Sequence, residues 1–239
     1  MISAPSTVNE RALTSAPRLT FTATVEQVLL VASVFFVLAA NRPFFGAAMH
    51  GHALGEPSTW GFLLAVATLL GSAHFLMLAL VANRWTLKPV LAALIVASAV
   101  ASYFMARYSI YLDATMMRNV LRTDVDEARE LLSPALLPHL LLYAALPVAL
   151  LWRVRVVQHP LLRATLVRLA ALLIATVTAL AALLAASQPL ASLLRNHREV
   201  RYLITPGNVV WSLGAVLARD TRAAVKPLRP LGLDAAPGP

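Results

Sequence analysis

Five long apolar stretches constrain the fold of this chain more than any other feature. They cover residues 19–40, 60–82, 87–106, 131–152 and 169–186. A helix of roughly 20 apolar residues can cross the hydrocarbon core of a bilayer, where the backbone must satisfy its own hydrogen bonds. Charged residues make up only 13% of the chain, against about 25% in soluble domains. The sequence therefore predicts an all-α integral membrane protein with five transmembrane helices.

Two of these stretches are less regular than the others. Residues 28–40 follow a polar lead in the pattern of a signal peptide, but four further stretches follow, so we expect an uncleaved first span. The fourth stretch contains Pro134, Pro138 and Pro147. The first two prolines fall in the opening turns, whereas Pro147 lies deeper and is expected to kink the helix.

The loop charges alternate along the chain and predict its orientation, because cytoplasmic loops carry an excess of lysine and arginine. The lead, residues 1–18, is basic, and the first and third connections are nearly neutral or slightly acidic. The second and fourth connections hold basic residues and no acid: Arg84, Lys88, Arg153, Arg155, Arg163 and Arg168. We therefore expect a cytoplasmic N-terminus and an outward-facing C-terminal region. The net charge of +9 fits anionic lipid headgroups rather than nucleic acid.

The third connection is predicted to form an amphipathic helix outside the membrane, over residues 113–130. Asn119, Thr123 and Glu127 are spaced i, i+4, i+8, so a continuous helix places them on one face. That face offers an amide, a hydroxyl and a carboxylate. A zwitterionic lipid headgroup needs a carboxylate for its ammonium and neutral donors for its phosphate, so this face is a candidate headgroup site.

The same residues also fit a helix cap. Thr123 precedes Asp124, Asp126 and Glu127, as an N-cap precedes the acidic residues of a first helical turn. On this interpretation the helix begins at Thr123 and Asn119 lies off its face. Glu127 is compatible with both interpretations.

Residues 187–225 are predicted to form interfacial helices after the fifth span. Three candidate lipid-phosphate contacts recur at every third position: Arg195, Arg198 and Arg201. Apolar side chains that can face lipid accompany them: Leu194, Leu203 and Ile204. The segment is either a surface anchor without a ligand, or its arginines bind lipid phosphates or brace a following domain.

A second interfacial helix is expected over residues 208–225. Pro206 and Gly207 interrupt the chain before it. Asn208 is suited to cap this helix, and Trp211 is suited to anchor it at the membrane surface.

The sequence gives little support for a metal site or for catalysis within these 239 residues. His50 and His52 are too few ligands for a structural metal, and the chain has no cysteine. No catalytic triad order and no phosphate-binding loop is found. We therefore expect no metal site, no cofactor and no catalytic residue in this chain. His74, inside a span, is expected to pack and hydrogen-bond rather than to relay protons.

Two segments resemble the membrane domain of bacterial lipid A phosphoethanolamine transferases. One is the run from Asn119 to Ala128, with Tyr111-Leu112-Asp113 and Met116 before it, and the other runs from Ser192 to Asn208. The resemblance implies a bacterial inner-membrane protein in which Asn119, Thr123 and Glu127 bind the headgroup of phosphatidylethanolamine. It also places the third connection and the C-terminal region in the periplasm.

The resemblance further implies a reaction. Phosphoethanolamine passes from phosphatidylethanolamine to a threonine and then to a lipid A phosphate, which lowers the attraction of the cell surface for cationic peptides. The threonine and its zinc belong to a periplasmic hydrolase-like domain in that family, and its motifs are not found here. Residues 226–239 have the composition of a linker, so we expect them to lead toward that domain and the chain alone to be inactive.

Two alternatives remain. The chain could be a non-catalytic membrane module that binds lipid or a separately encoded partner. It could also be a small transporter subunit, although the spans offer few polar groups for a path through the bilayer.

Overall fold

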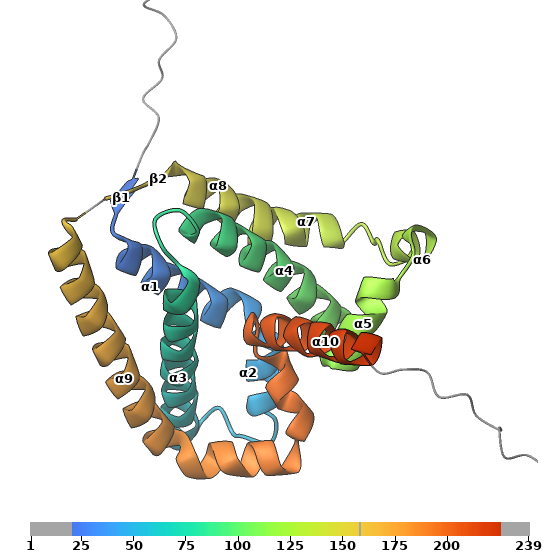
Figure 1. The fold of residues 1–239 in the computed structure, drawn as a ribbon. Coiled ribbons are helices and arrows are strands. Elements are labelled where there is room, and N and C mark those ends of the chain that lie inside the picture. Colours follow the sequence, from blue (N-terminus) through green and yellow to red (C-terminus); the bar gives the residue numbers. More distant parts are fainter. Residues whose placement is uncertain (1–20, 158, 226–239) are drawn as a thin grey trace, which may run out of the picture.

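The computed structural model describes residues 21–157 and 159–225, and the helices dominate (Figure 1). The expected lead 1–18 and linker 226–239 lie outside these residues. In chain order the elements are β1 (Phe21–Ala23), α1 (Val25–Phe35), the π-helical turn η2 (Phe36–Ala40), α2 (Arg42–Ala48), α3 (Pro57–Val81), α4 (Leu87–Tyr108), α5 (Ala114–Arg122), α6 (Val125–Glu130), α7 (Leu136–Leu140), the π-helical turn η3 (Leu141–Ala145), α8 (Leu146–Arg153), β2 (Val154–Val156), α9 (Leu161–Asn196), the 3₁₀ helix η4 (Arg198–Leu203) and α10 (Gly207–Val225).

The membrane-spanning helices agree with the predicted all-α membrane class. Four are long and apolar enough to cross a bilayer: α3, α4, the α7–η3–α8 helix and α9. The α1–η2 helix and α2 form a pair bent by 60°, and this pair makes a fifth span if it is counted as one. Counted as one span, this pair is a broken helix rather than the straight one expected over residues 19–40.

The start of the first span differs from the prediction. Phe21–Ala23 forms a strand that pairs in parallel with Val154–Val156, in the register Phe21 to Val154. The helix begins only at Val25, where Thr24 and Gln27 form a capping box. The strand pair joins the ends of the first and fourth spans, and nothing in the local hydropathy indicates it.

The fifth span is longer than its apolar stretch. Helix α9 has 36 residues and continues to Asn196, so the segment after residue 186 does not start a separate interfacial helix. In Figure 1 the orange C-terminal part of α9 runs at a steep angle to the rest. Pro189 lies inside the helix, and a proline removes one helical hydrogen bond and bends the axis.

Arg168, counted above as a loop charge, lies in α9. Its guanidinium donates hydrogen bonds to the backbone carbonyls of Ala79 and Ala82 at the end of α3. A basic group satisfies the orphan carbonyls of a helix C-terminus well. This contact fastens α9 to α3, and the two helices lie side by side (Figure 1).

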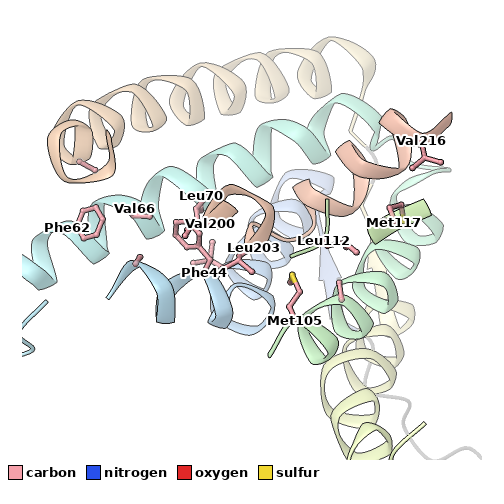
Figure 2. Close-up of a cluster of buried hydrophobic side chains, with 14 residues drawn as sticks. Phe44, Phe62, Val66, Leu70, Met105, Leu112, Met117, Val200, Leu203 and Val216 are labelled. Atoms are coloured by element: carbon pink, nitrogen blue, oxygen red, sulfur yellow. The ribbon is translucent and has the colours of Figure 1, made fainter. Parts of the chain in front are cut away.

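The buried apolar side chains form two clusters. One includes Leu29, Phe36, Leu78 and Leu91, from α1, η2, α3 and α4. The other joins α2 and the first half of α3 to the end of α4 and to α5, η4 and α10. Figure 2 shows Phe44, Phe62, Met105, Leu112, Met117, Leu203 and Val216 from it. The second cluster therefore packs the C-terminal segment against the third connection.

Candidate lipid-headgroup site

The third connection is two short helices rather than one. Helix α5 begins at the N-cap Asp113, whose carboxylate accepts the Met116 N–H at 2.8 Å, and it ends at Thr123. Helix α6 begins at the N-cap Asp124, whose carboxylate accepts the N–H groups of Asp126 and Glu127 at 3.0 and 2.9 Å. The expected continuous helix over 113–130 is therefore wrong, because Asp124 starts a new helix.

The capping interpretation correctly expected a helix to begin in this connection, but it named Thr123 as the N-cap. Asp124 is the N-cap of α6, and Thr123 ends α5 instead. A carboxylate next to the threonine accepts two backbone N–H groups at once, and it also faces the positive end of the helix dipole. As that interpretation expected, Asn119 lies outside α6.

Asn119 and Thr123 remain neighbours on the last turn of α5. The backbone N–H and the hydroxyl of Thr123 both donate to the Asn119 carbonyl, at 2.8 and 2.9 Å. The hydroxyl proton of Thr123 is thus committed to the backbone, which leaves its oxygen as an acceptor. Glu127 lies in the first turn of α6, across the break.

The polar ends of Asn119 and Glu127 are open to ligands. Both residues are exposed, and no hydrogen bond or ion pair within the described residues uses the Asn119 amide or the Glu127 carboxylate. The amide can donate to a phosphate oxygen, and the carboxylate can accept from an ammonium. The three predicted residues thus lie around one helix break, with two of them unpaired.

The C-terminal helix braces this connection. The Ser212 hydroxyl donates to the Leu112 carbonyl at 2.8 Å, and both residues are buried. Arg118 of α5 forms an ion pair with Asp220 of α10 at 3.4 Å. These contacts join segments about a hundred residues apart, so local sequence patterns could not reveal them.

Asn208 has a different role from the one expected. It lies in the first turn of α10, is buried, and donates to the Tyr202 carbonyl at 2.7 Å and to the Met105 sulfur at 3.4 Å. Its side-chain oxygen accepts from the neighbouring Val209 N–H at 2.7 Å. Asn208 therefore ties α10 to η4 and α4.

The predicted arginines lie at the surface, on a segment that is itself partly buried. Arg195 ends α9, Arg198 and Arg201 lie on η4, and all three are exposed. The Arg201 guanidinium lies 4.8 Å from the Tyr202 ring centre. Leu203 is only 6% exposed and belongs to the cluster in Figure 2, so the expectation that it faces lipid is wrong: η4 packs into the protein.

Three of the histidines lie against aromatic rings. His52 stacks on Phe62 at 5.6 Å, and His74 lies 6.0 Å from Phe36 with no hydrogen-bond partner among the described residues. His139 lies 3.0 Å from the Ala99 carbonyl and 5.3 Å from the Tyr103 ring. The described residues contain no group of three or more histidine and acidic side chains placed to hold a metal.

These features define a multi-pass α-helical membrane domain with a polar site on short helices between its spans. A family model described as phosphoethanolamine transferase EptA/EptB matches residues 70–221, well over half of the chain. The chain belongs to this family and corresponds to its N-terminal membrane domain. The resemblance seen in the sequence is confirmed.

Individual relatives agree with this assignment. The phosphatidylethanolamine transferase Mcr-1 of Escherichia coli is 31% identical over 206 residues, which are 85% of this chain and 38% of that protein. Phosphoethanolamine transferase EptA of Escherichia coli K12 is 25% identical over 208 residues, 87% of this chain and 38% of that protein. The chain thus spans under two fifths of these relatives' length.

A solved structure has the same fold. It is the lipooligosaccharide phosphoethanolamine transferase A (EptA) of Neisseria meningitidis, with a TM-score of 0.80 and 23% identity. The match covers 89% of this chain and 41% of that one.

Proposed function

We propose that this chain is the membrane domain of an enzyme that moves phosphoethanolamine from phosphatidylethanolamine to lipid A. In this role it anchors the enzyme in the bacterial inner membrane and forms part of the site for the donor lipid. Family membership and the names of the relatives support the reaction. The main structural support for the donor-lipid site is that the Asn119 amide and the Glu127 carboxylate are both exposed and unpaired among the described residues.

The geometry suggests a role for each residue. Glu127 accepts hydrogen bonds from the ammonium of the headgroup, and the Asn119 amide donates to its phosphate. Thr123 fixes the end of α5 that carries Asn119, because its hydroxyl donates to the Asn119 carbonyl at 2.9 Å. The exposed arginines Arg195, Arg198 and Arg201 offer secondary contacts to lipid phosphates.

The proposal also includes an orientation and a division of labour. The N-terminus lies in the cytoplasm, and the third connection and C-terminal region lie in the periplasm, in keeping with the loop charges. The catalytic threonine and zinc of the family belong to a periplasmic domain, where the metal would activate the threonine and stabilise phosphate charge. The present residues bind and position lipid for that domain.

Binding of phosphatidylethanolamine to the purified chain tests this proposal. Native mass spectrometry in mild detergent would compare the wild type with Glu127→Gln, and with Glu130→Gln as the control. Both residues are exposed and lie on α6, and neither caps the helix. We expect Glu127→Gln to weaken retention of phosphatidylethanolamine about tenfold, the size of one charge-assisted hydrogen bond, and Glu130→Gln to leave it unchanged. Equal retention by the two variants would refute the site.

A further inference from the structure

An apolar groove of about 740 Å³ runs between α1, α4 and the η3–α8 helix. Its walls include Val28, Val31, Ile95, Leu146 and Leu150. The groove is open to the side, since Val31 is 69% exposed and Leu146 is 50% exposed. No acidic side chain lines it.

The groove is long enough for part of a hydrocarbon chain. Its wall follows one helix face from Leu142 and Tyr143 to Leu150 and Leu151, and continues to Val154 at the start of β2. At 1.5 Å per residue, the eight steps from Tyr143 to Leu151 span roughly 12 Å. An extended, laterally open and apolar shape suits an acyl chain better than a compact polar ligand.

One end of the groove carries a positive charge. Tyr143 lines this end, and the Arg42 guanidinium lies 5.3 Å from the centre of its ring. His139 contacts the same ring, at 4.6 Å. Among the residues that the structure describes, no ion pair involves Arg42. An exposed guanidinium without a carboxylate partner is complementary to a phosphate.

Irregular helix geometry brings these groups together. Arg42 comes two residues after the π-helical turn η2, and Tyr143 is the central residue of the π-helical turn η3. Such turns inside α-helices are frequent at functional sites. Asn41, next to Arg42, is fixed by hydrogen bonds to Phe36 and Thr205, so the backbone that carries Arg42 is held in place.

We propose that this groove binds an anionic phospholipid, with one acyl chain along the apolar wall and the phosphate on Arg42. The site differs from the headgroup site on α5 and α6, because no carboxylate here can receive an ammonium. Phosphate charge therefore decides binding, and a phosphatidylglycerol headgroup is favoured over phosphatidylethanolamine. This inference goes beyond the proposed transferase role and does not depend on it.

Lipid retention by the purified chain tests the headgroup end. The chain would be equilibrated in mild detergent with equal amounts of phosphatidylglycerol and phosphatidylethanolamine and analysed by native mass spectrometry. We expect Arg42→Gln to reduce retained phosphatidylglycerol about tenfold, and Arg42→Lys to reduce it less. The control is Arg122→Gln, which removes an exposed arginine at the end of α5 and should have no effect.

A matched pair on α1 tests the acyl-chain end. Val31 lines the groove, whereas its neighbour Leu30 is 57% exposed and does not line it. We expect Val31→Trp to fill the groove and lower phosphatidylglycerol retention several-fold, and Leu30→Trp to leave it unchanged. Retention by Arg42→Gln equal to that of Arg122→Gln would overturn the proposal, as would equal retention by the two tryptophan variants.

Folding is checked on the same samples by circular dichroism. If Arg42→Gln or Val31→Trp loses helical signal, Arg42→Lys and Val31→Phe replace them with the same expected direction. Similar loss of lipid from all variants and controls would indicate unselective surface lipid and would also overturn the proposal.

Discussion

The side-chain amide of Asn41 and the backbone of Thr205 hydrogen-bond to each other in both directions. The amide donates to the Thr205 carbonyl at 2.6 Å, and its oxygen accepts the Thr205 N–H at 2.9 Å. Asn41 lies at the bend between η2 and α2, Thr205 lies between η4 and α10, and both are fully buried. The pair therefore joins the broken first span to the segment that carries the C-terminal helix.

Replacement of Asn41 should destabilise the whole domain. Asn41→Leu leaves the buried N–H and carbonyl of Thr205 without partners, and we expect a loss of about 2–4 kcal/mol in the free energy of unfolding. Unfolding in mild detergent, followed by circular dichroism, measures it. The control is Asn119→Leu at an exposed site, where a change within about 0.5 kcal/mol is expected. An equal effect of both substitutions would show that the Asn41–Thr205 pair contributes nothing.

The cap of α6 can be tested by hydrogen exchange. We expect Asp124→Ala to remove the acceptor for the Asp126 and Glu127 N–H groups and to destabilise α6 locally by about 1 kcal/mol. Exchange of the α6 amides should then become faster, while Thr123→Ala should affect only the end of α5. Faster exchange in α6 after Thr123→Ala, but not after Asp124→Ala, would show that Thr123 is the N-cap of α6.

Local sequence patterns predicted the membrane class because hydropathy acts over single helices. The expected spans over 60–82 and 87–106 correspond to helices α3 and α4, at Pro57–Val81 and Leu87–Tyr108. The bend after Ala40 is fixed by the Asn41–Thr205 pair, and the strand Phe21–Ala23 pairs with Val154–Val156, so both depend on partners far along the chain. A window of twenty residues contains no information about such partners.

Two contacts between α10 and the third connection should differ in strength. The buried Ser212 hydroxyl satisfies the Leu112 carbonyl, so Ser212→Ala should cost about 1–3 kcal/mol of unfolding free energy. The Arg118–Asp220 pair has side chains 29% and 53% exposed. A double-mutant cycle on this pair should give at most about 1 kcal/mol. A coupling energy for the Arg118–Asp220 pair larger than the unfolding free energy lost in Ser212→Ala would contradict the argument that the buried contact is the stronger one.

The predicted orientation can be measured with single cysteines, because the chain has none of its own. Ala128→Cys, in the third connection, should react with a membrane-impermeant maleimide added to spheroplasts. Trp85→Cys, in the second connection, is also exposed but should react only after the membrane is permeabilised. The opposite labelling pattern would invert the proposed topology.

The helix geometry of the candidate site could not be read from the sequence, and its role in headgroup binding stays a prediction. The spacing of Asn119, Thr123 and Glu127 assumed one helix, whereas the structure has two, α5 and α6. Thr123 and Asp124 are adjacent, and both residue types are good N-caps. Local preference therefore does not show which of the two begins the second helix. The bracing residues Ser212 and Asp220 carry no local signal, because their partners lie in α5 and just before it.

The most direct test of the headgroup site is a hydrogen-exchange measurement of the chain in nanodiscs of two compositions. One contains phosphatidylethanolamine and the other phosphatidylcholine, whose trimethylammonium group has no N–H to donate. The proposed site predicts slower exchange over residues 119–130 with phosphatidylethanolamine, and loss of this difference in Glu127→Gln but not in Glu130→Gln. Identical exchange over these residues in both nanodiscs would contradict the central claim that this connection binds the donor headgroup.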